Sequence, residues 1–166
     1  MASAIAIWVA LGVAAPPATQ SPGAAASSSE VETPHLAVRT SSSAPHASAG
    51  GRVSLFVDVA LKPTMHVYAP EEKEAIPVTL TLAPGDAFKP AAQQFPKAEK
   101  FFFAPLKLTQ LVYSKSFRIA QPVTIAKASA AGSTLEIKGT FRYQACDDKV
   151  CYSPRNVPVA WELQIR

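Results

Sequence analysis

Apolar and polar residues alternate with a period of two in several runs of this chain. The two longest runs flank residues 144–154. In both runs the large apolar residues lie at odd-numbered positions: Leu135, Ile137, Phe141 and Tyr143 in the first, and Val157, Val159, Trp161, Leu163 and Ile165 in the second. Such alternation is the pattern of a strand with one buried face. We therefore expect two long strands that are joined by a hairpin.

Shorter runs of strand character precede this hairpin. They cover residues 52–61, 65–68, 76–82, 106–113, 116–119 and 123–126. Residues 87–105 show no clean period and contain three prolines. Seven or eight short strands, with turn residues between them and no helical period, predict an all-β sandwich.

The amino-terminal residues have a different character. Residues 1–15 are apolar over a length that is too short to span a bilayer comfortably but suits the core of a secretory signal. Small residues follow, and Ala24–Ala26 before Ser27 offer a cleavage site, although no Lys or Arg precedes the apolar run. We expect a signal peptide or membrane tether over residues 1–26, and hence export.

Residues 27–50 are rich in Ala, Ser, Pro and Thr and contain few large apolar side chains. Such a segment buries too little surface to offset the entropy of ordering, so it predicts a flexible linker. Leu36 and Val38 allow a first strand at residues 35–40, while His35 and His46 are expected to be solvated without a role. The folded domain is then expected at residues 51–166.

Composition and charge narrow the range of functions. The net charge is +4, but the basic residues are spread along the chain, which argues against nucleic-acid binding. The sequence has no Gly-x-Ser-x-Gly motif, and His66 has no evident nucleophile beside it, so hydrolase chemistry has no support. No cofactor is expected.

The chain has two cysteines, Cys146 and Cys151, with four residues between them. This spacing is not the Cys-x-x-Cys of a thioredoxin-like site, and the three histidines lack the pairing of a zinc site. A structural disulfide, a redox-active disulfide and two free thiols all remain open. A disulfide closing so short a loop should stabilise the fold by about 2 kcal/mol, which suits either a modest staple or an exchangeable bond.

The cysteine segment carries a resemblance to a known family. Residues 143–154, Tyr-Gln-Ala-Cys-Asp-Asp-Lys-Val-Cys-Tyr-Ser-Pro, and the Val-Pro-Val-Ala-Trp of residues 157–161 resemble the active-site hairpin of DsbD amino-terminal periplasmic domains. Residues 65–70 resemble the early strand of that family. Phe95-Pro96, the three phenylalanines at 101–103 and Val112-Tyr113 fall where the family has its cap loop and next strand. The resemblance covers residues 35–166.

The resemblance implies an immunoglobulin-like β-sandwich and an exported, periplasmic thiol:disulfide exchange module. In that role Cys151 would form the mixed disulfide with a partner and Cys146 would resolve it. Asp147 and Asp148 would disfavour a thiolate, while Lys149 and Arg155 would favour it. The supporting or capping residues implied are His66, Tyr68, Phe101, Phe102, Phe103 and Tyr143.

The three phenylalanines have two interpretations, because three consecutive side chains cannot all face one side of a strand. Phe101, Phe102 and Phe103 either include one or two core anchors in an irregular segment or form a loop tip that covers the disulfide. The family resemblance favours the cap.

The expected partners are thioredoxin-like redox proteins and a membrane electron donor on separate chains, because the multi-helix and thioredoxin-like domains of longer family members are not in this sequence. The chain would then be an oxidoreductase only as a relay. An alternative is a non-catalytic immunoglobulin-like interaction domain with a structural disulfide. A copper site with Met65, His66 and the cysteines is less favoured, since methionine and histidine are scarce.

Overall fold

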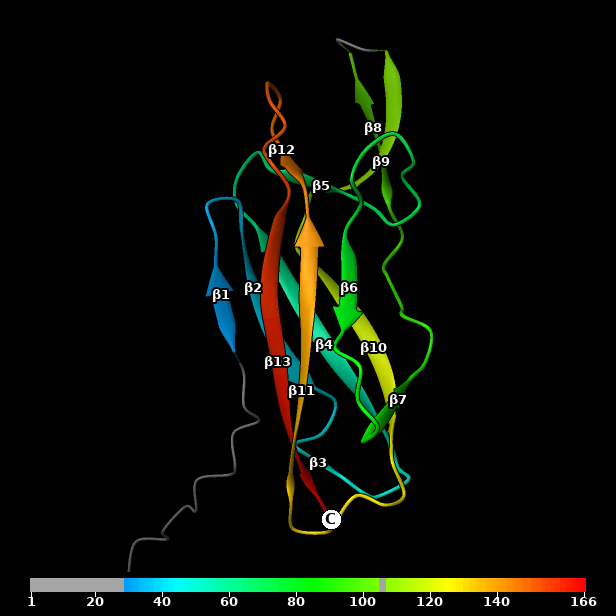
Figure 1. Cartoon of the computed structure of the whole chain (residues 1–166). Coiled ribbons are helices and arrows are strands. Elements are labelled where there is room, and N and C mark those ends of the chain that lie inside the picture. The colour runs from blue at the N-terminus through cyan, green and yellow to red at the C-terminus, as the bar shows by residue number, and fades with distance from the viewer. Residues whose placement is uncertain (1–28, 105–106) are drawn as a thin grey trace, which may run out of the picture.

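The computed structural model describes residues 29–104 and 107–166. The secondary structure of these residues is entirely β, in three sheets (Figure 1). The first sheet has the order β1 (Glu30–Glu32), β2 (Leu36–Ser42), β4 (Arg52–Leu61), β10 (Phe117–Ile125) and β7 (Phe88–Pro90). The second has the order β3 (His46–Ala47), β13 (Arg155–Ile165), β11 (Thr134–Tyr143) and β6 (Thr79–Leu82). The third has the order β12 (Ala145–Cys146), β5 (His66–Tyr68), β9 (Leu108–Tyr113) and β8 (Glu99–Phe103).

The first two sheets pack face to face as a sandwich, and the small third sheet lies across one end, at the top of Figure 1. Neighbouring strands are antiparallel except for β3 and β13, which run parallel. The predicted all-β sandwich is therefore confirmed.

The core lies between the two large sheets and follows the predicted parity. In β13 the buried positions are 157, 159, 161, 163 and 165, and in β4 they are 53, 55, 57 and 59. Each fully buried aliphatic or aromatic side chain contributes about 1.5–3 kcal/mol relative to exposure. Trp161 on β13 also donates its indole N–H to the carbonyl oxygen of Phe56 on β4, at 3.1 Å, which ties the two sheets together.

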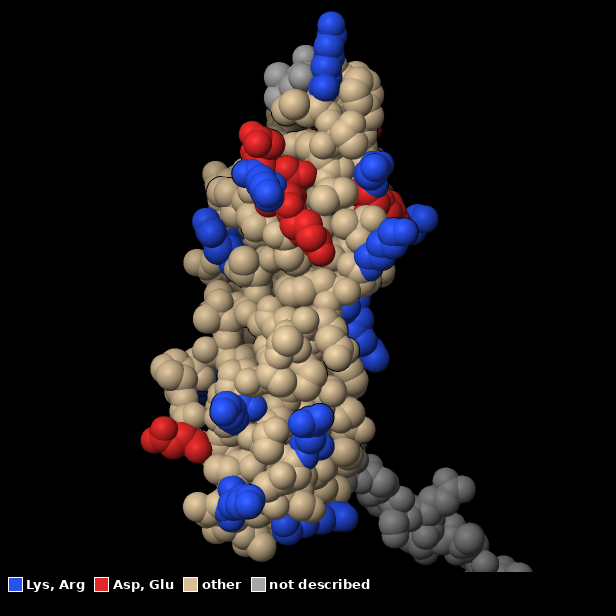
Figure 2. Space-filling model, turned by 90° about the vertical axis from the view of Figure 1, so that its right-hand side faces the viewer, with Lys and Arg blue, Asp and Glu red and all other residues tan. Residues whose placement is uncertain are grey.

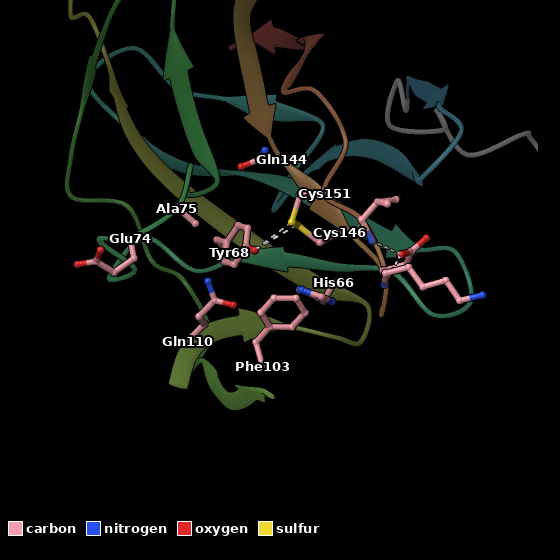
Figure 3. Close-up of a pocket in the computed structure, with 12 residues that line it drawn as sticks. His66, Tyr68, Glu74, Ala75, Phe103, Gln110, Gln144, Cys146 and Cys151 are labelled. Carbon is pink, nitrogen blue, oxygen red and sulfur yellow. Dashed lines mark hydrogen bonds between the residues drawn. A yellow bond between two sulfur atoms is a disulfide. The ribbon is translucent and has the colours of Figure 1, made fainter. Parts of the chain in front are cut away.

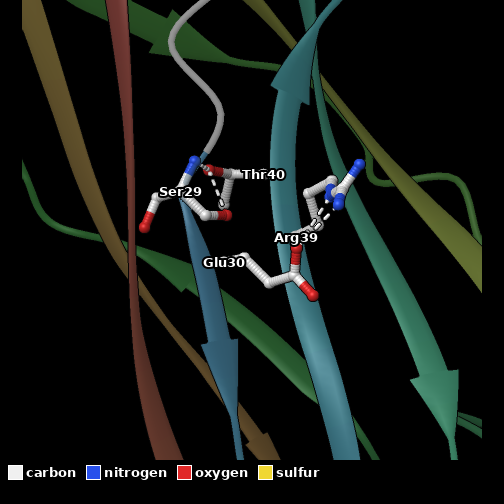
Figure 4. Close-up of polar contacts among 4 residues, drawn as sticks. All are labelled: Ser29, Glu30, Arg39 and Thr40. Carbon is white, nitrogen blue, oxygen red and sulfur yellow. Dashed lines mark hydrogen bonds and ion pairs between the residues drawn. The ribbon is translucent and has the colours of Figure 1, made fainter.

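The prediction of a flexible linker at residues 27–50 is wrong for the described part of this segment, because it contains strands β1, β2 and β3. Strand β2 confirms a strand near residues 35–40, although β1 precedes it, and it pairs with β4 along its whole length. Polar contacts hold β1 on β2: Arg39 pairs with Glu30 at 2.7 Å, and Thr40 Oγ1 accepts from the Ser29 amide at 3.3 Å (Figure 4). The segment is thus ordered by strand pairing together with the burial of Leu36 and Val38 in the core.

The histidines of this segment are not solvated as expected. His35 is 6% exposed and His46 is half-buried. The expected signal peptide or tether at residues 1–26 lies outside the described residues. Among the residues that are described, none forms a helix able to cross a membrane.

Two strand predictions also need correction. The separate strands expected at residues 116–119 and 123–126 are one strand, β10, which runs through Pro122. The Pro122 carbonyl accepts from the Ala91 amide, on the side of the strand away from β4, so the missing N–H of Pro122 costs no bond to β4. Residues 87–105, which lack a period, contain the short edge strands β7 and β8.

Candidate functional site

The two cysteines meet at the edge of the small sheet. Strand β12 pairs with β5 so that Cys146 lies opposite His66, and Cys151 returns to form an isolated bridge with Cys146. Their sulfurs form a disulfide, with the two Cα atoms 4.0 Å apart. Of the alternatives left by the spacing, two free thiols are therefore not what the structure contains.

The turn between the cysteines is built around Asp147. Its Oδ1 accepts from the amides of Lys149 and Val150, both at 2.8 Å, and its Oδ2 accepts from the Tyr152 hydroxyl at 2.8 Å. Asp is a favoured turn residue because its carboxylate can bond amides two or three residues ahead. These bonds, those from Val150 and Lys149 first, lower the pKa of Asp147. A fixed negative charge therefore lies next to Cys146 in sequence.

The two cysteines differ sharply in accessibility. Cys146 is 1% exposed and packs in a small buried cluster with Tyr68 and Val112. Cys151, on the far side of the turn, is exposed. A thiolate from another molecule can therefore reach Cys151 more readily than Cys146.

Strand β5 places two aromatic side chains beside the disulfide (Figure 3). The Tyr68 hydroxyl lies 3.1 Å from Cys146 Sγ and 3.4 Å from Cys151 Sγ. The His66 ring contacts Tyr68 edge-on and is 5% exposed. Burial is the largest cause that lowers the pKa of His66, against the raising effect of Asp148 and Asp147, so its neutral form is favoured.

The three phenylalanines form strand β8, not an irregular segment. Phe101 and Phe103 are half-buried on the face that looks toward the disulfide, whereas Phe102 is 61% exposed on the other face. The Phe101 ring lies 4.7 Å from the His66 ring, centroid to centroid, and packs against the cluster that contains Cys146. The strand thus packs Phe101 on the cluster around Cys146 and lines the pocket with Phe103, so the interpretation of an irregular segment is wrong and the cap stays a prediction.

Tyr143 lies apart from the other predicted site residues. It is fully buried in β11, and its hydroxyl donates to Thr33 Oγ1 at 2.8 Å and lies 3.4 Å from His35 Nδ1. Its side chain does not line the pocket at the disulfide. Tyr143 contributes instead to the packing between the start of β2 and the cysteine hairpin.

A pocket of about 230 Å³ opens over the disulfide (Figure 3). Five of the predicted site residues line it, namely His66, Tyr68, Phe103, Cys146 and Cys151, whereas Phe101 and Phe102 do not. The rest of its lining is Glu74, Ala75, Gln110, Gln144, Asp147, Lys149 and Val150. Sequence reasoning missed Gln110, which is buried and lies opposite Phe101 in the β8–β9 register. Gln110 reaches the site because β9 pairs with β5, and its own strand shows no motif from which this could have been predicted.

The described residues contain no group of three or more His, Cys, Asp or Glu side chains placed to hold a metal ion. The cysteine sulfurs that the copper interpretation needs are bonded to each other. The geometry therefore gives that interpretation no support.

The end of the molecule that carries the small sheet has both acidic and basic side chains, and the acidic ones gather near the disulfide pocket. Figure 2 shows that most of the Asp and Glu side chains visible on that face lie toward the end that carries the small sheet. At the pocket itself, Glu74 and Asp147 face a single lysine, Lys149. The surroundings of the sulfurs therefore do little to stabilise a thiolate by opposite charge.

Comparisons with known proteins agree with this geometry. A family model described as "Thiol:disulfide interchange protein DsbD, N-terminal" matches residues 34–160. Among solved structures, the N-terminal periplasmic domain of ScsB from Proteus mirabilis is 16% identical with a TM-score of 0.53, over 81% of this chain and 49% of that one. The chain thus spans about half of the ScsB structure, and the likeness shows a shared fold.

A second solved structure, the reduced DsbD N-terminal domain of Neisseria meningitidis, is 20% identical with a TM-score of 0.47, over 78% of this chain and 91% of that one. No curated protein matches the sequence.

Proposed function

The chain belongs to the family of DsbD amino-terminal domains, and from this membership we propose that it is an exported thiol:disulfide exchange module. The Cys146–Cys151 pair would relay reducing equivalents between thioredoxin-fold proteins. In this role Cys151 is the sulfur that exchanges with the partner and Cys146 is the sulfur that leaves and later resolves.

The observation that carries these roles is the difference in exposure between the two cysteines. Thiol–disulfide exchange requires the attacking sulfur to reach its target in line with the bond that breaks. Cys151 is exposed on the turn, whereas Cys146 is 1% exposed behind Tyr68. A protein-sized partner that docks on the turn therefore meets Cys151.

The exchange proceeds in two steps. A partner thiolate attacks Cys151 Sγ, the Cys146–Cys151 bond breaks, and its electron pair stays on Cys146 Sγ. A second partner thiol then attacks the partner's own sulfur and releases Cys151, so that the partner dithiol is oxidised and the cysteine pair is reduced. The reduced pair passes the electrons on by the reverse sequence with an oxidised protein.

The surface near the disulfide supports a protein partner. Of the large apolar side chains that are exposed in the described residues, Leu108 and Val150, at 39% and 52%, lie on the side of the disulfide, whereas Phe102, at 61%, lies on the opposite face of β8. Val150 lines the disulfide pocket, and Leu108 lies opposite Phe103 in the β8–β9 register. We propose that they contact thioredoxin-like proteins, with a membrane electron donor on a separate chain and residues 1–26 as signal or tether.

The roles of the cysteines can be tested with Cys146→Ser and Cys151→Ser. Both variants lack the disulfide, so each is the control for the stability loss of the other. The probe is a thioredoxin variant that keeps a single active-site cysteine, and the sulfur of this cysteine is linked to thionitrobenzoate in a mixed disulfide. The lone Cys151 in Cys146→Ser should displace thionitrobenzoate and form the mixed disulfide at least about tenfold faster than the lone Cys146, because Cys146 is buried.

Equal rates for the two variants would remove the assigned roles. The function itself is tested by the reduction potential of the native pair. A potential below about −300 mV would indicate a structural disulfide, and thereby the alternative of a non-catalytic interaction domain.

A further inference from the structure

Tyr68 is held with its hydroxyl beside the disulfide, within 3.1 Å of Cys146 Sγ and 3.4 Å of Cys151 Sγ, as Figure 3 shows. Its strand, β5, is flanked by β12 on one side and β9 on the other. The Tyr68 carbonyl accepts from the Val78 amide at 2.9 Å, and the ring contacts His66. The side chain is 4% exposed, so the hydroxyl is fixed by packing near both atoms that exchange.

The leaving sulfur needs such a group. When the disulfide opens at Cys151, the electron pair is left on Cys146 Sγ, which is buried away from water. A desolvated anion is costly unless hydrogen bonds or opposite charges compensate. Apart from tyrosines, the ionisable side chains of the described residues that line this pocket or act on its residues are His66, Glu72, Glu74, Asp147, Asp148 and Lys149.

These groups do not supply the compensation. Four of the six are carboxylates, and burial favours neutral His66 by lowering its pKa. Lys149 is an exposed residue of the turn, where water screens its charge. Within the described part of the chain, the Tyr68 hydroxyl is the side-chain hydrogen-bonding group in contact with Cys146 Sγ.

We propose that Tyr68 is a catalytic residue whose hydroxyl donates a hydrogen bond to Cys146 Sγ while this sulfur carries the negative charge. The proposal rests on the proposed exchange function and adds the group that stabilises the leaving thiolate. In the resolving direction the same bond raises the fraction of Cys146 present as thiolate, which is the form that attacks the mixed disulfide.

Tyr68 donates a hydrogen bond and keeps its proton. Burial, the largest cause, raises the pKa of the Tyr68 hydroxyl above its ordinary value of about 10. An ordinary cysteine thiol has a pKa of about 8.5, so the phenol holds its proton more tightly than the thiol does. The proton that finally neutralises Cys146 therefore comes from solvent or from the partner thiol.

The test compares Tyr68→Phe with Tyr113→Phe. Tyr113 is a matched control, because it lies in the same sheet, is also 4% exposed, and donates its hydroxyl to the Pro96 carbonyl instead of to a sulfur. The Cys146 pKa is read from the pH dependence of its Cβ chemical shift in the Cys151→Ser background. The second measurement is the rate at which dithiothreitol reduces the native disulfide.

In Tyr68→Phe the Cys146 pKa should rise by about one unit or more, since a hydrogen bond to a charged group is that strong. Reduction by dithiothreitol should slow by about tenfold, since a thiol of higher pKa leaves more slowly. Tyr113→Phe should change neither quantity. An unchanged Cys146 pKa and an unchanged rate in folded Tyr68→Phe would overturn the proposal.

A second variant keeps the test decisive if Tyr68→Phe does not fold. 3-Fluorotyrosine at position 68 keeps the ring and the hydroxyl but is a stronger hydrogen-bond donor, so it should lower the Cys146 pKa and speed reduction. An unchanged or raised Cys146 pKa would contradict the proposal. Neither measurement uses a protein partner, so failure of the relay function would show separately, in the thioredoxin trapping experiment.

Discussion

Replacing Phe101 by alanine tests whether strand β8 gates the disulfide. The Phe101 ring lies on His66, which is the cross-strand neighbour of Cys146, and packs on the buried cluster around that cysteine. Among the strands of the described residues, β8 is the edge of its sheet and pairs only with β9. Loss of the ring should therefore loosen the β8–β9 hairpin over the site more than it loosens the sandwich.

The size of the effect follows from the burial of the ring. Truncation of a fully buried phenylalanine to alanine lowers the free energy of unfolding by about 3–5 kcal/mol. Because Phe101 is half-buried, we expect Phe101→Ala to lower it by about 2 kcal/mol. If reduction requires local opening of the hairpin, the same 2 kcal/mol raises the open population by about thirtyfold. Reduction by a small thiol should accelerate by up to that factor.

The assay measures two quantities, the rate of reduction of the oxidised protein by dithiothreitol and its melting temperature. Phe102→Ala is the matched control, because Phe102 is in the same strand but is 61% exposed on the opposite face, and it should change neither quantity. If Phe101→Ala loses stability but its disulfide is reduced at the native rate, the hypothesis that β8 gates the disulfide is refuted. The exchange chemistry of the cysteines would not be affected by that result.

Two further changes test the packing around the site and within the sandwich. Burial lowers the pKa of His66, so the unfolded chain binds a proton below about pH 6.5 that the folded chain resists, and stability falls as the pH drops through that value. His66→Phe keeps the ring contacts and should make the fall in melting temperature between about pH 7 and about pH 5 shallower; an unchanged slope would contradict this. Gly139→Ala should cost about 1–3 kcal/mol in urea unfolding, because the new Cβ would lie 2.8 Å from the Thr81 carbonyl oxygen. Gly85→Ala, which meets only ordinary contact, is the control, and equal midpoints for the two variants would refute the clash.

The sequence by itself determined the long strands and the place of the cysteine pair. Strands β4, β11 and β13 have the buried parity that their alternation predicted, although β13 begins at Arg155, ahead of the predicted run, because side-chain direction in a strand has a period of two whatever its partner is. The cysteine hairpin followed from the two alternating runs that flank it. The family resemblance then suggested which residues to examine around the disulfide.

Only the tertiary structure decided what surrounds the sulfurs. Tyr68 reaches Cys146 across 78 residues of sequence because β5 pairs with β12, and Gln110 joins them because β9 pairs with β5. Tyr143, nearer to the cysteines in sequence, points instead to Thr33. Closeness along the chain is therefore a poor guide to closeness at this site.

The same reason explains the errors at the amino-terminal side of the domain. Residues 29–50 contain too few large apolar side chains to indicate order by composition, yet β2 has a complete strand partner in β4, and His35 is buried against Tyr143 and Tyr152. A local pattern reports which way a side chain points. Which strand lies next to it depends on pairings between distant residues, and these pairings order the small polar segment and build the pocket over the disulfide.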